Sequence, residues 1–86
     1  MKFIPLKNKI KYLNKIYLSQ GCLYLVAAAH EDMNGIKYEI VCWNPSEYCW
    51  NLLGYSRENY FEWLEGKGII FHDNTQENLT KLKLIL

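Results

Sequence analysis

The sequence predicts an α+β protein in which an antiparallel β-hairpin precedes three short helices. Two observations indicate this class: a turn signal with glycine joins two runs of β-forming residues, and three later segments each open on residues that cap helices. With 86 residues, half of them apolar, the chain has room for one small domain, residues 1–86, with a thin core. The expected strands cover about 22–30 and 36–43, and the expected helices cover about 45–53, 57–65 and 75–85.

The hairpin is expected from three adjacent pieces of sequence. Residues 22–30 form a continuous apolar run that suits a strand buried on both faces, although its alanines leave a helix open. Asn34 and Gly35 supply the pair of positive φ angles that a tight hairpin turn prefers. Residues 36–43 then combine β-branched and aromatic side chains with an alternation of period two. Together these pieces predict two antiparallel strands joined by a tight turn.

The first helix is expected directly after the second strand. Asn44 suits the acceptor position of a helix cap, Pro45 suits the first helical position, and Glu47 stands where a capping-box carboxylate reaches back. Gly54 can take the left-handed conformation that ends a helix. The residues between them form one apolar stripe at helical spacing, made of Tyr48, Cys49, Leu52 and Leu53. The pattern therefore predicts a short helix with one apolar face.

Two more helices are expected in the second half of the chain. Residues 57–65 carry apolar side chains at helical spacing and are followed by glycines, and residues 75–85 follow several residues that can cap a helix. Residues 79–86 also alternate like a strand, and residues 6–18 fit a helix or a strand equally well. The pattern leaves the secondary structure of these last two segments open.

The segment around the first expected helix resembles PAS sensor domains. In that family an Asn-Pro pair, a short apolar helix and a Leu-Gly-Tyr-Ser-Arg-Glu-like run follow one another. Residues 32–35 are similar to the turn between the first two PAS strands, and residues 72–73 to the His-Pro-Asp-Asp segment without its proline. The resemblance covers about residues 22–80, and the chain ends before three later strands of a PAS sheet. The matching residues are Asn44, Pro45, Leu52, Leu53, Gly54, Tyr55, Ser56, Arg57 and Glu58.

The resemblance implies the N-terminal half of a PAS fold and a sensory or protein-interaction role. PAS domains often hold flavin, haem or a small metabolite, but the Asn-Cys-Arg-Phe motif of the flavin-adduct light sensors is absent around Cys49. The cofactor is therefore unknown, and a small-molecule ligand is left open. A sheet without its later strands has unpaired edges, so we expect a homodimer or another protein partner.

Charge divides the chain without indicating nucleic acid or a membrane as partner. The net charge is +1, yet residues 1–20, the basic N-terminal segment, carry five lysines and no acid, whereas residues 31–65 carry seven acids and two bases. Lysines mixed with apolar residues are typical of the solvent-exposed face of a helix or of an edge strand, and no arginine cluster marks a phosphate-binding surface. No run reaches the roughly 20 apolar residues of a membrane span.

A signal peptide is the alternative interpretation of the first third of the chain. Residues 16–29 are mostly apolar, follow the lysines and end in three alanines, Ala27 to Ala29, which fits a small-residue cleavage rule. The polar residues 19–21 interrupt the apolar run and argue against this interpretation. We therefore expect a cytoplasmic protein.

The residue patterns do not indicate catalysis or a metal site. The three cysteines, Cys22, Cys42 and Cys49, are odd in number and lack a Cys-x-x-Cys pair, so they predict reduced and buried thiols. His30 and His72 each adjoin carboxylates, but neighbours in sequence point in different directions in a strand. A metal site assembled from these residues is the weaker alternative, and we expect a protein that is not an enzyme.

An aromatic group is the expected functional surface, because flat amphipathic side chains build protein interfaces and ligand pockets, although they also build ordinary cores. The expected function is a non-catalytic sensory or protein-interaction module that signals by ligand-dependent or constitutive protein contact. The alternative is an unrelated small interaction or inhibitor protein, such as one encoded by a mobile element, that uses an aromatic acidic surface. The group consists of Trp43, Tyr48, Trp50, Tyr55, Tyr60, Phe61 and Trp63.

Overall fold

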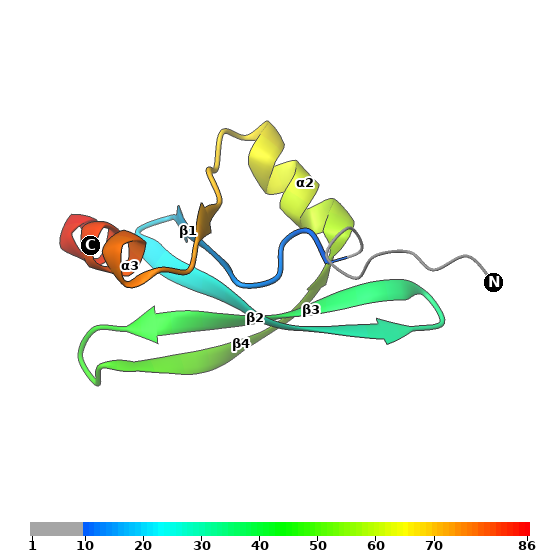
Figure 1. Cartoon of the computed structure of the whole chain (residues 1–86), viewed down its shortest axis with the longest axis horizontal. Coiled ribbons are helices and arrows are strands. Elements are labelled where there is room, and N and C mark those ends of the chain that lie inside the picture. Colours follow the sequence, from blue (N-terminus) through cyan, green and yellow to red (C-terminus); the bar gives the residue numbers. More distant parts are fainter. Residues whose placement is uncertain (1–9) are drawn as a thin grey trace.

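The described part of the chain folds into five strands and two helices. The computed structural model describes residues 10–86, whose course is shown in Figure 1. In chain order the elements are β1 (Lys15–Ser19), β2 (Cys22–Asp32), β3 (Gly35–Asn44), β4 (Cys49–Arg57), α2 (Glu58–Gly66), β5 (His72–Asp73) and α3 (Gln76–Ile85). The α+β class is therefore confirmed, but a larger sheet replaces the expected hairpin.

The strands form one antiparallel sheet in the order β4-β3-β2-β1-β5. β1, β2 and β3 each pair with the next strand along the chain, and β5 then returns to pair with β1. The register between β2 and β3 shifts between Val26 and Ala28, so Ala27 is an extra residue in β2. Such a β-bulge bends its strand and increases the local twist of the sheet.

Two tight turns set the register of this sheet. Gln20 and Gly21 form the two-residue loop between β1 and β2, with positive φ angles of 52° and 78°. Positive φ at both positions is typical of a type I′ turn, whose twist matches that of the flanking strands. In the turn between β2 and β3 only Gly35 has a positive φ, 108°, and the carboxylate of Asp32 accepts the N–H of Asn34 at 2.9 Å. The expectation of positive φ at Asn34 is wrong.

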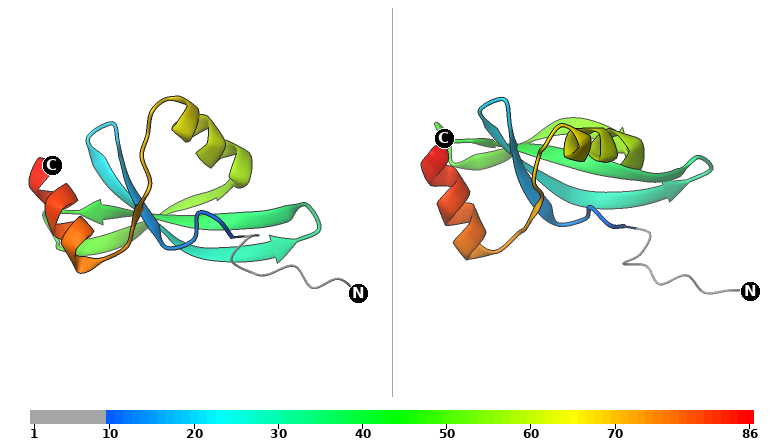
Figure 2. Two further views of the ribbon diagram at one scale, coloured as in Figure 1. Left: turned by 45° about the horizontal axis from the view of Figure 1, so that its top comes forward. Right: turned by 90° about the horizontal axis from the view of Figure 1, so that it is seen from above.

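Apolar side chains cover both faces of the sheet, because successive residues of a strand point to opposite faces. The face that carries Tyr17 packs against α2, and the face that carries Ile16 packs against α3. Figure 2 shows α3 at the end of the sheet where β3 turns into β4, whereas α2 lies away from that turn. The larger core, under α2, consists of Tyr12, Tyr17, Val26, Tyr38, Ile40, Phe61 and Leu64, and the smaller core of Ile16, Leu23 and Leu82.

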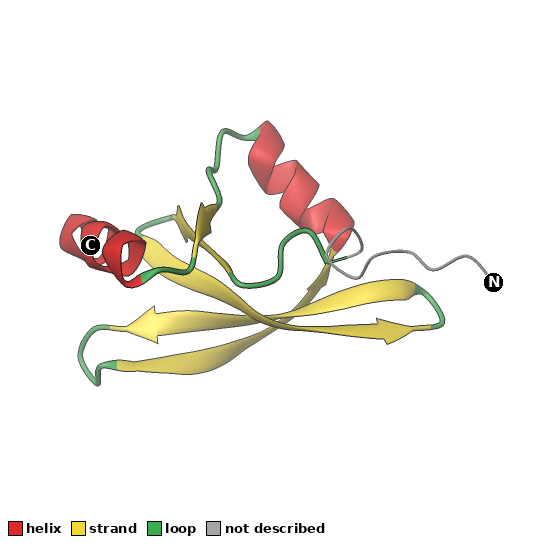
Figure 3. Ribbon diagram, in the orientation of Figure 1, coloured by secondary structure: helices red, strands yellow, loops and turns green. Residues whose placement is uncertain are grey.

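The expected arrangement of a hairpin followed by three helices is wrong, because residues 45–53 do not form a helix (Figure 3). Asn44 Oδ1 does accept the N–H groups of Ser46 and Glu47, at 3.0 and 3.3 Å, so one capped turn forms. Tyr48 then takes a positive φ of 53°, which ends the turn, and β4 pairs with β3. The truncated PAS-like arrangement expected here is therefore replaced by a five-stranded sheet.

Pairing with β3 explains why this segment is a strand. A helix at 45–53 would leave one edge of β3 without hydrogen-bond partners in the protein, whereas β4 satisfies that edge. Trp50 also gains a cross-strand partner in Trp43, with ring centroids 5.3 Å apart. These tertiary contributions outweigh the helical pattern of the sequence.

The other expected elements form close to their expected positions. The strands expected at 22–30 and 36–43 are β2 and β3, and each is longer than expected. The helices expected at 57–65 and 75–85 are α2 and α3. Thr75 caps α3, because its side chain accepts the N–H of Asn78 at 3.1 Å.

The structure also decides the segments that the pattern left open. Of residues 79–86, all but Leu86 belong to α3. The described part of 6–18 is a turn followed by the start of β1. Ala27 to Ala29, considered as a cleavage site, lie inside β2. The predictions made for residues 1–9, which include three of the N-terminal lysines, lie outside the described residues.

The turn between β1 and β2 generates a stability prediction. Glutamine at φ 52° is strained, because left-handed backbone favours glycine and asparagine over other residues. We expect Gln20→Asn to raise the free energy of unfolding by about 0.5–1 kcal/mol, measured by urea unfolding. Gln20→Val, which places a β-branched residue at the same φ, should lower it. A variant with asparagine that is less stable than the wild type would contradict the assigned turn.

Candidate functional site

β4 is the open edge of the sheet. It lies at one end of the strand order, and within residues 10–86 no strand pairs with its outer side. It has nine residues, whereas β5 at the other end has two. Leu52, Leu53 and Tyr55 of β4 are 58%, 61% and 52% exposed. A long edge strand with apolar side chains is a template for pairing with another chain.

A β-bulge at Leu53 directs the middle of β4 toward α2. Val41 pairs with Leu52 and Ile40 pairs with Gly54, so Leu53 has no partner in β3. The extra residue bends the strand and re-aims its side chain. Leu53 consequently lines a pocket with residues of α2, while Leu52 and Tyr55 do not line it.

α2 presents a second row of aromatic side chains outside the core. Phe61 and Leu64 are its buried residues, whereas Tyr60 and Trp63 are 39% and 55% exposed. The rings of Tyr60 and Trp63 stack with centroids 6.0 Å apart and an angle of 27°. Lys67 Nζ lies 4.5 Å from the centroid of the Trp63 ring, within the range of a cation–π interaction. α2 therefore packs on the core through Phe61 and Leu64 and exposes an aromatic row, Tyr60 and Trp63, on its outer side.

A pocket of about 350 Å³ lies between this row, the bulge of β4 and the turn between β1 and β2. Tyr24 of β2 contributes to its floor, and Ile69 lines it from the loop after α2. The volume falls within the range of small-molecule sites, near its lower end. The full lining consists of Ser19, Gln20, Tyr24, Leu53, Tyr60, Trp63, Leu64, Lys67 and Ile69.

The phenol groups beneath the pocket stay protonated at neutral pH. Burial raises the pKa of Tyr24 to about 12, and a hydrogen bond with Cys22 adds to the shift. Burial also raises the pKa of Tyr17, with further contributions from Tyr60 and Tyr24. The Tyr17 and Tyr24 rings stack with centroids 5.1 Å apart. The floor of the pocket is therefore neutral and aromatic, with hydroxyl groups that can donate hydrogen bonds.

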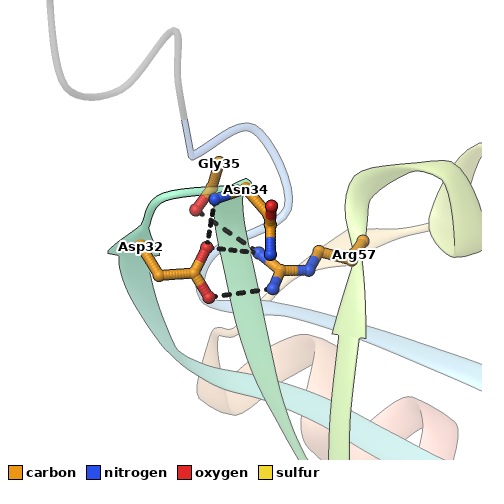
Figure 4. Close-up of polar contacts among 4 residues, drawn as sticks. All are labelled: Asp32, Asn34, Gly35 and Arg57. Atoms are coloured by element: carbon orange, nitrogen blue, oxygen red, sulfur yellow. Dashed lines mark hydrogen bonds and ion pairs between the residues drawn. The ribbon is translucent and has the colours of Figure 1, made fainter.

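An ion pair holds the end of β4 and the start of α2 in place (Figure 4). The guanidinium of Arg57 donates to both carboxylate oxygens of Asp32, at 2.9 and 2.8 Å, and to the carbonyl of Gly35 at 3.4 Å. Arg57 thus links β4 to the turn between β2 and β3. The hydrogen bonds from Arg57, and then the one from the Asn34 N–H, lower the pKa of Asp32 to about 2. The same pair raises the pKa of Arg57.

The three cysteines lie on neighbouring strands of the sheet. All are free and half-buried, on β2, β3 and β4. Burial raises the pKa of Cys42, and Cys22 beside it raises the pKa further, which disfavours the nucleophilic thiolate. Cys49 Sγ instead lies 3.5 Å from Asn51 Oδ1. Among residues 10–86, no three histidines, cysteines or acidic residues are placed to hold a metal ion.

The structure separates the expected aromatic group into four parts. Tyr60 and Trp63 border the pocket, and Phe61 lies in the core. Tyr55 lies on β4, with Lys37 Nζ 4.9 Å from its ring centroid. The remaining three residues meet where β3 turns into β4, with Lys83 of α3 3.8 Å from the Trp43 ring centroid; they are Trp43, Tyr48 and Trp50.

Several residues of the site were not predicted from the sequence. Leu52 and Leu53 were assigned to the apolar face of a helix, but they lie exposed on the open edge. Tyr24 and Lys67 were not singled out, although they form the floor and the charged rim of the pocket. The spacing of Tyr60, Trp63 and Lys67 at helical intervals was the available signal for the outward row.

No family model, no curated protein and no solved structure matches this chain. Across residues 10–86, no helix has the length and apolar character needed to cross a membrane. The resemblance of residues 22–80 to PAS domains therefore stays a prediction.

Acid should weaken the pair between Asp32 and Arg57. The pKa of Asp32 falls from an ordinary value of 3.8 to about 2 in the folded protein. The pair therefore stabilises the fold above about pH 4, and this contribution is lost as the pH falls toward about 2, because the unfolded chain takes up the proton first. Urea unfolding at about pH 5 and about pH 2.5 should show a larger loss of stability for the wild type than for Asp32→Asn.

The matched control is Glu77→Gln, which removes an exposed carboxylate from α3. Glu77→Gln should lose as much stability on acidification as the wild type does, because Asp32 and Arg57 are unchanged. The amide oxygen that Asp32→Asn introduces can still accept the Asn34 N–H, so the turn is preserved. Equal losses in the wild type and Asp32→Asn would contradict the role given to the ion pair.

Proposed function

We propose that this protein is a non-catalytic interaction module that binds by adding a strand to the open edge of β4. The observation that carries the proposal is the edge itself: nine residues long, with no charge between Cys49 and Ser56 and three exposed large apolar side chains. Edge strands of natural proteins are usually short or protected by lysine, proline or a bulge. β4 has the bulge at Leu53 but neither of the other two protections.

A second copy of the chain is the partner that we propose for this edge. Two β4 strands that meet antiparallel about a two-fold axis bring no like charges together, because the one charged residue of β4, Arg57, is already paired with Asp32. Leu52 and Tyr55 would lose contact with water on pairing, which favours association through the hydrophobic effect. Continuous pairing of the two sheets would also give the outer N–H and C=O groups of β4 protein partners.

This proposal retains the interaction role that the resemblance to PAS domains implies, and it assigns that role to an edge strand. Contact between copies would be constitutive, because the edge is open without any ligand. We further propose a cytoplasmic location, since three unpaired cysteines suit a reducing compartment.

Disruption of the edge should separate the copies. Leu52→Lys places a charge opposite its counterpart near the centre of the proposed pairing, and the exposed position makes a large effect on folding unexpected. We expect sedimentation equilibrium to give a dimer for the wild type and a monomer for Leu52→Lys. Hydrogen exchange should be slower for β4 amides in the wild type than in the variant.

Leu84→Lys is the matched control, because Leu84 is an 81% exposed leucine that belongs to α3 and not to the edge strand. Leu84→Lys should sediment as a dimer, as the wild type does. A wild type that stays monomeric at high concentration would contradict pairing between copies. A dimer that both lysine variants leave intact would place the interface elsewhere than β4.

A further inference from the structure

We infer that the pocket beside α2 is a binding site for a small planar aromatic molecule that carries one negative charge, such as an aromatic carboxylate. This inference goes beyond pairing through β4 and does not depend on it. The pocket lies on the α2 face of the sheet, and of the exposed apolar residues of β4 only Leu53 reaches it.

The size and walls of the pocket select a flat ring system. Its volume of about 350 Å³ suits one small ligand. The stacked rings of Tyr60 and Trp63 form one wall, and Tyr24, itself stacked on Tyr17, lies in the floor. Aromatic groups prefer stacked or edge-to-face contacts with other rings, so an aromatic ligand gains more here than an aliphatic ligand of equal area.

The charge of the pocket selects an anion. Lys67 is the only charged residue in its lining, and no ion pair occupies Lys67 among residues 10–86. The glutamates of α2 face Tyr12 instead, whose hydroxyl donates a hydrogen bond to Glu65. Burial raises the pKa of Tyr12, and Glu65, Glu62 and Glu58 raise it further. The acidic residues of α2 therefore lie toward Tyr12, and none of them lines this pocket.

Neutral hydrogen-bond donors can complete the recognition of a carboxylate. Ser19 and Gln20 line the pocket at the turn between β1 and β2, and each has a side-chain group that can donate to an anionic oxygen. The hydroxyl of Tyr60 is a further donor in the lining. A carboxylate only accepts hydrogen bonds. A pocket with aromatic walls, hydrogen-bond donors and one cation therefore suits an aromatic monoanion better than a cation or a neutral amine.

The test compares three probes, of which two share the aromatic ring system and two share the negative charge. 2-Naphthoate has both the ring system and the charge, 2-naphthamide has the same shape without charge, and cyclohexanecarboxylate has the charge without an aromatic ring. We titrate each into nitrogen-15-labelled protein and follow the indole N–H of Trp63 and the amide of Leu53. We expect saturable shifts with 2-naphthoate, binding about fivefold weaker with 2-naphthamide, and no saturation with cyclohexanecarboxylate.

Lys67→Met tests the role of the charge, with Lys81→Met on α3 as the matched control, because both lysines are exposed. Lys67→Met should bring the affinity for 2-naphthoate down to that for 2-naphthamide, and Lys81→Met should leave it unchanged. Equal affinity for the acid and the amide in the wild type would overturn the assignment of an anion. Shifts at Trp43 and Trp50 in place of Trp63 would overturn the assignment of the pocket.

The same titration on Leu52→Lys separates this inference from the proposed function. Saturable binding to that variant would support the pocket whether or not the wild type dimerises. Absence of saturation at millimolar 2-naphthoate in both proteins would overturn the pocket and leave pairing through β4 unaffected.

Discussion

The ring of Phe61 packs against Tyr12 and Tyr38, with centroids 5.0 and 5.2 Å away, and so holds α2 against the sheet. Phe61 is fully buried, and it also meets Tyr17 and Phe71, with centroids 6.4 and 5.9 Å away. Segments from before β1 to the loop before β5 thus converge on one side chain. In a chain of this size, large aromatic side chains supply burial that smaller residues could not. The position of α2, and with it one wall of the pocket, depends on this cluster.

The open edge and the pocket result from the same shortage of covering elements. α2 has nine residues and α3 has ten, while β2 and β3 have eleven and ten. Each helix covers part of one face, and the middle of β4, at Leu52, Leu53 and Tyr55, stays exposed. Exposed leucines on β4 and an aromatic row on α2 remain beside each other, with the bulge at Leu53 between them. Association with another molecule is one way in which such surfaces lose contact with water.

Local chemistry was predictable wherever one segment decides the outcome. Thr75 caps α3 through its own side chain, and Asn44 caps a turn as its position before Pro45 indicated. The extent of the helical turn after Asn44 was not predictable in this way, because Tyr48 leaves the helical conformation only in order to bring β4 beside β3. The candidate site was not predictable for the same reason, because Leu53 belongs to the pocket only if residues 49–57 are a strand with a bulge.

The amino-acid sequence was sufficient to establish the α+β class, the β2–β3 pair and two of the helices, since each depends on residues close together in the chain. Long-range packing was needed to make residues 49–57 an edge strand, to point Tyr60 and Trp63 outward while Phe61 points inward, and to leave Lys67 as the one charge in a pocket. Strand pairing is a contact between distant residues, and its hydrogen bonds outweigh the small free-energy differences by which a segment prefers helix or strand.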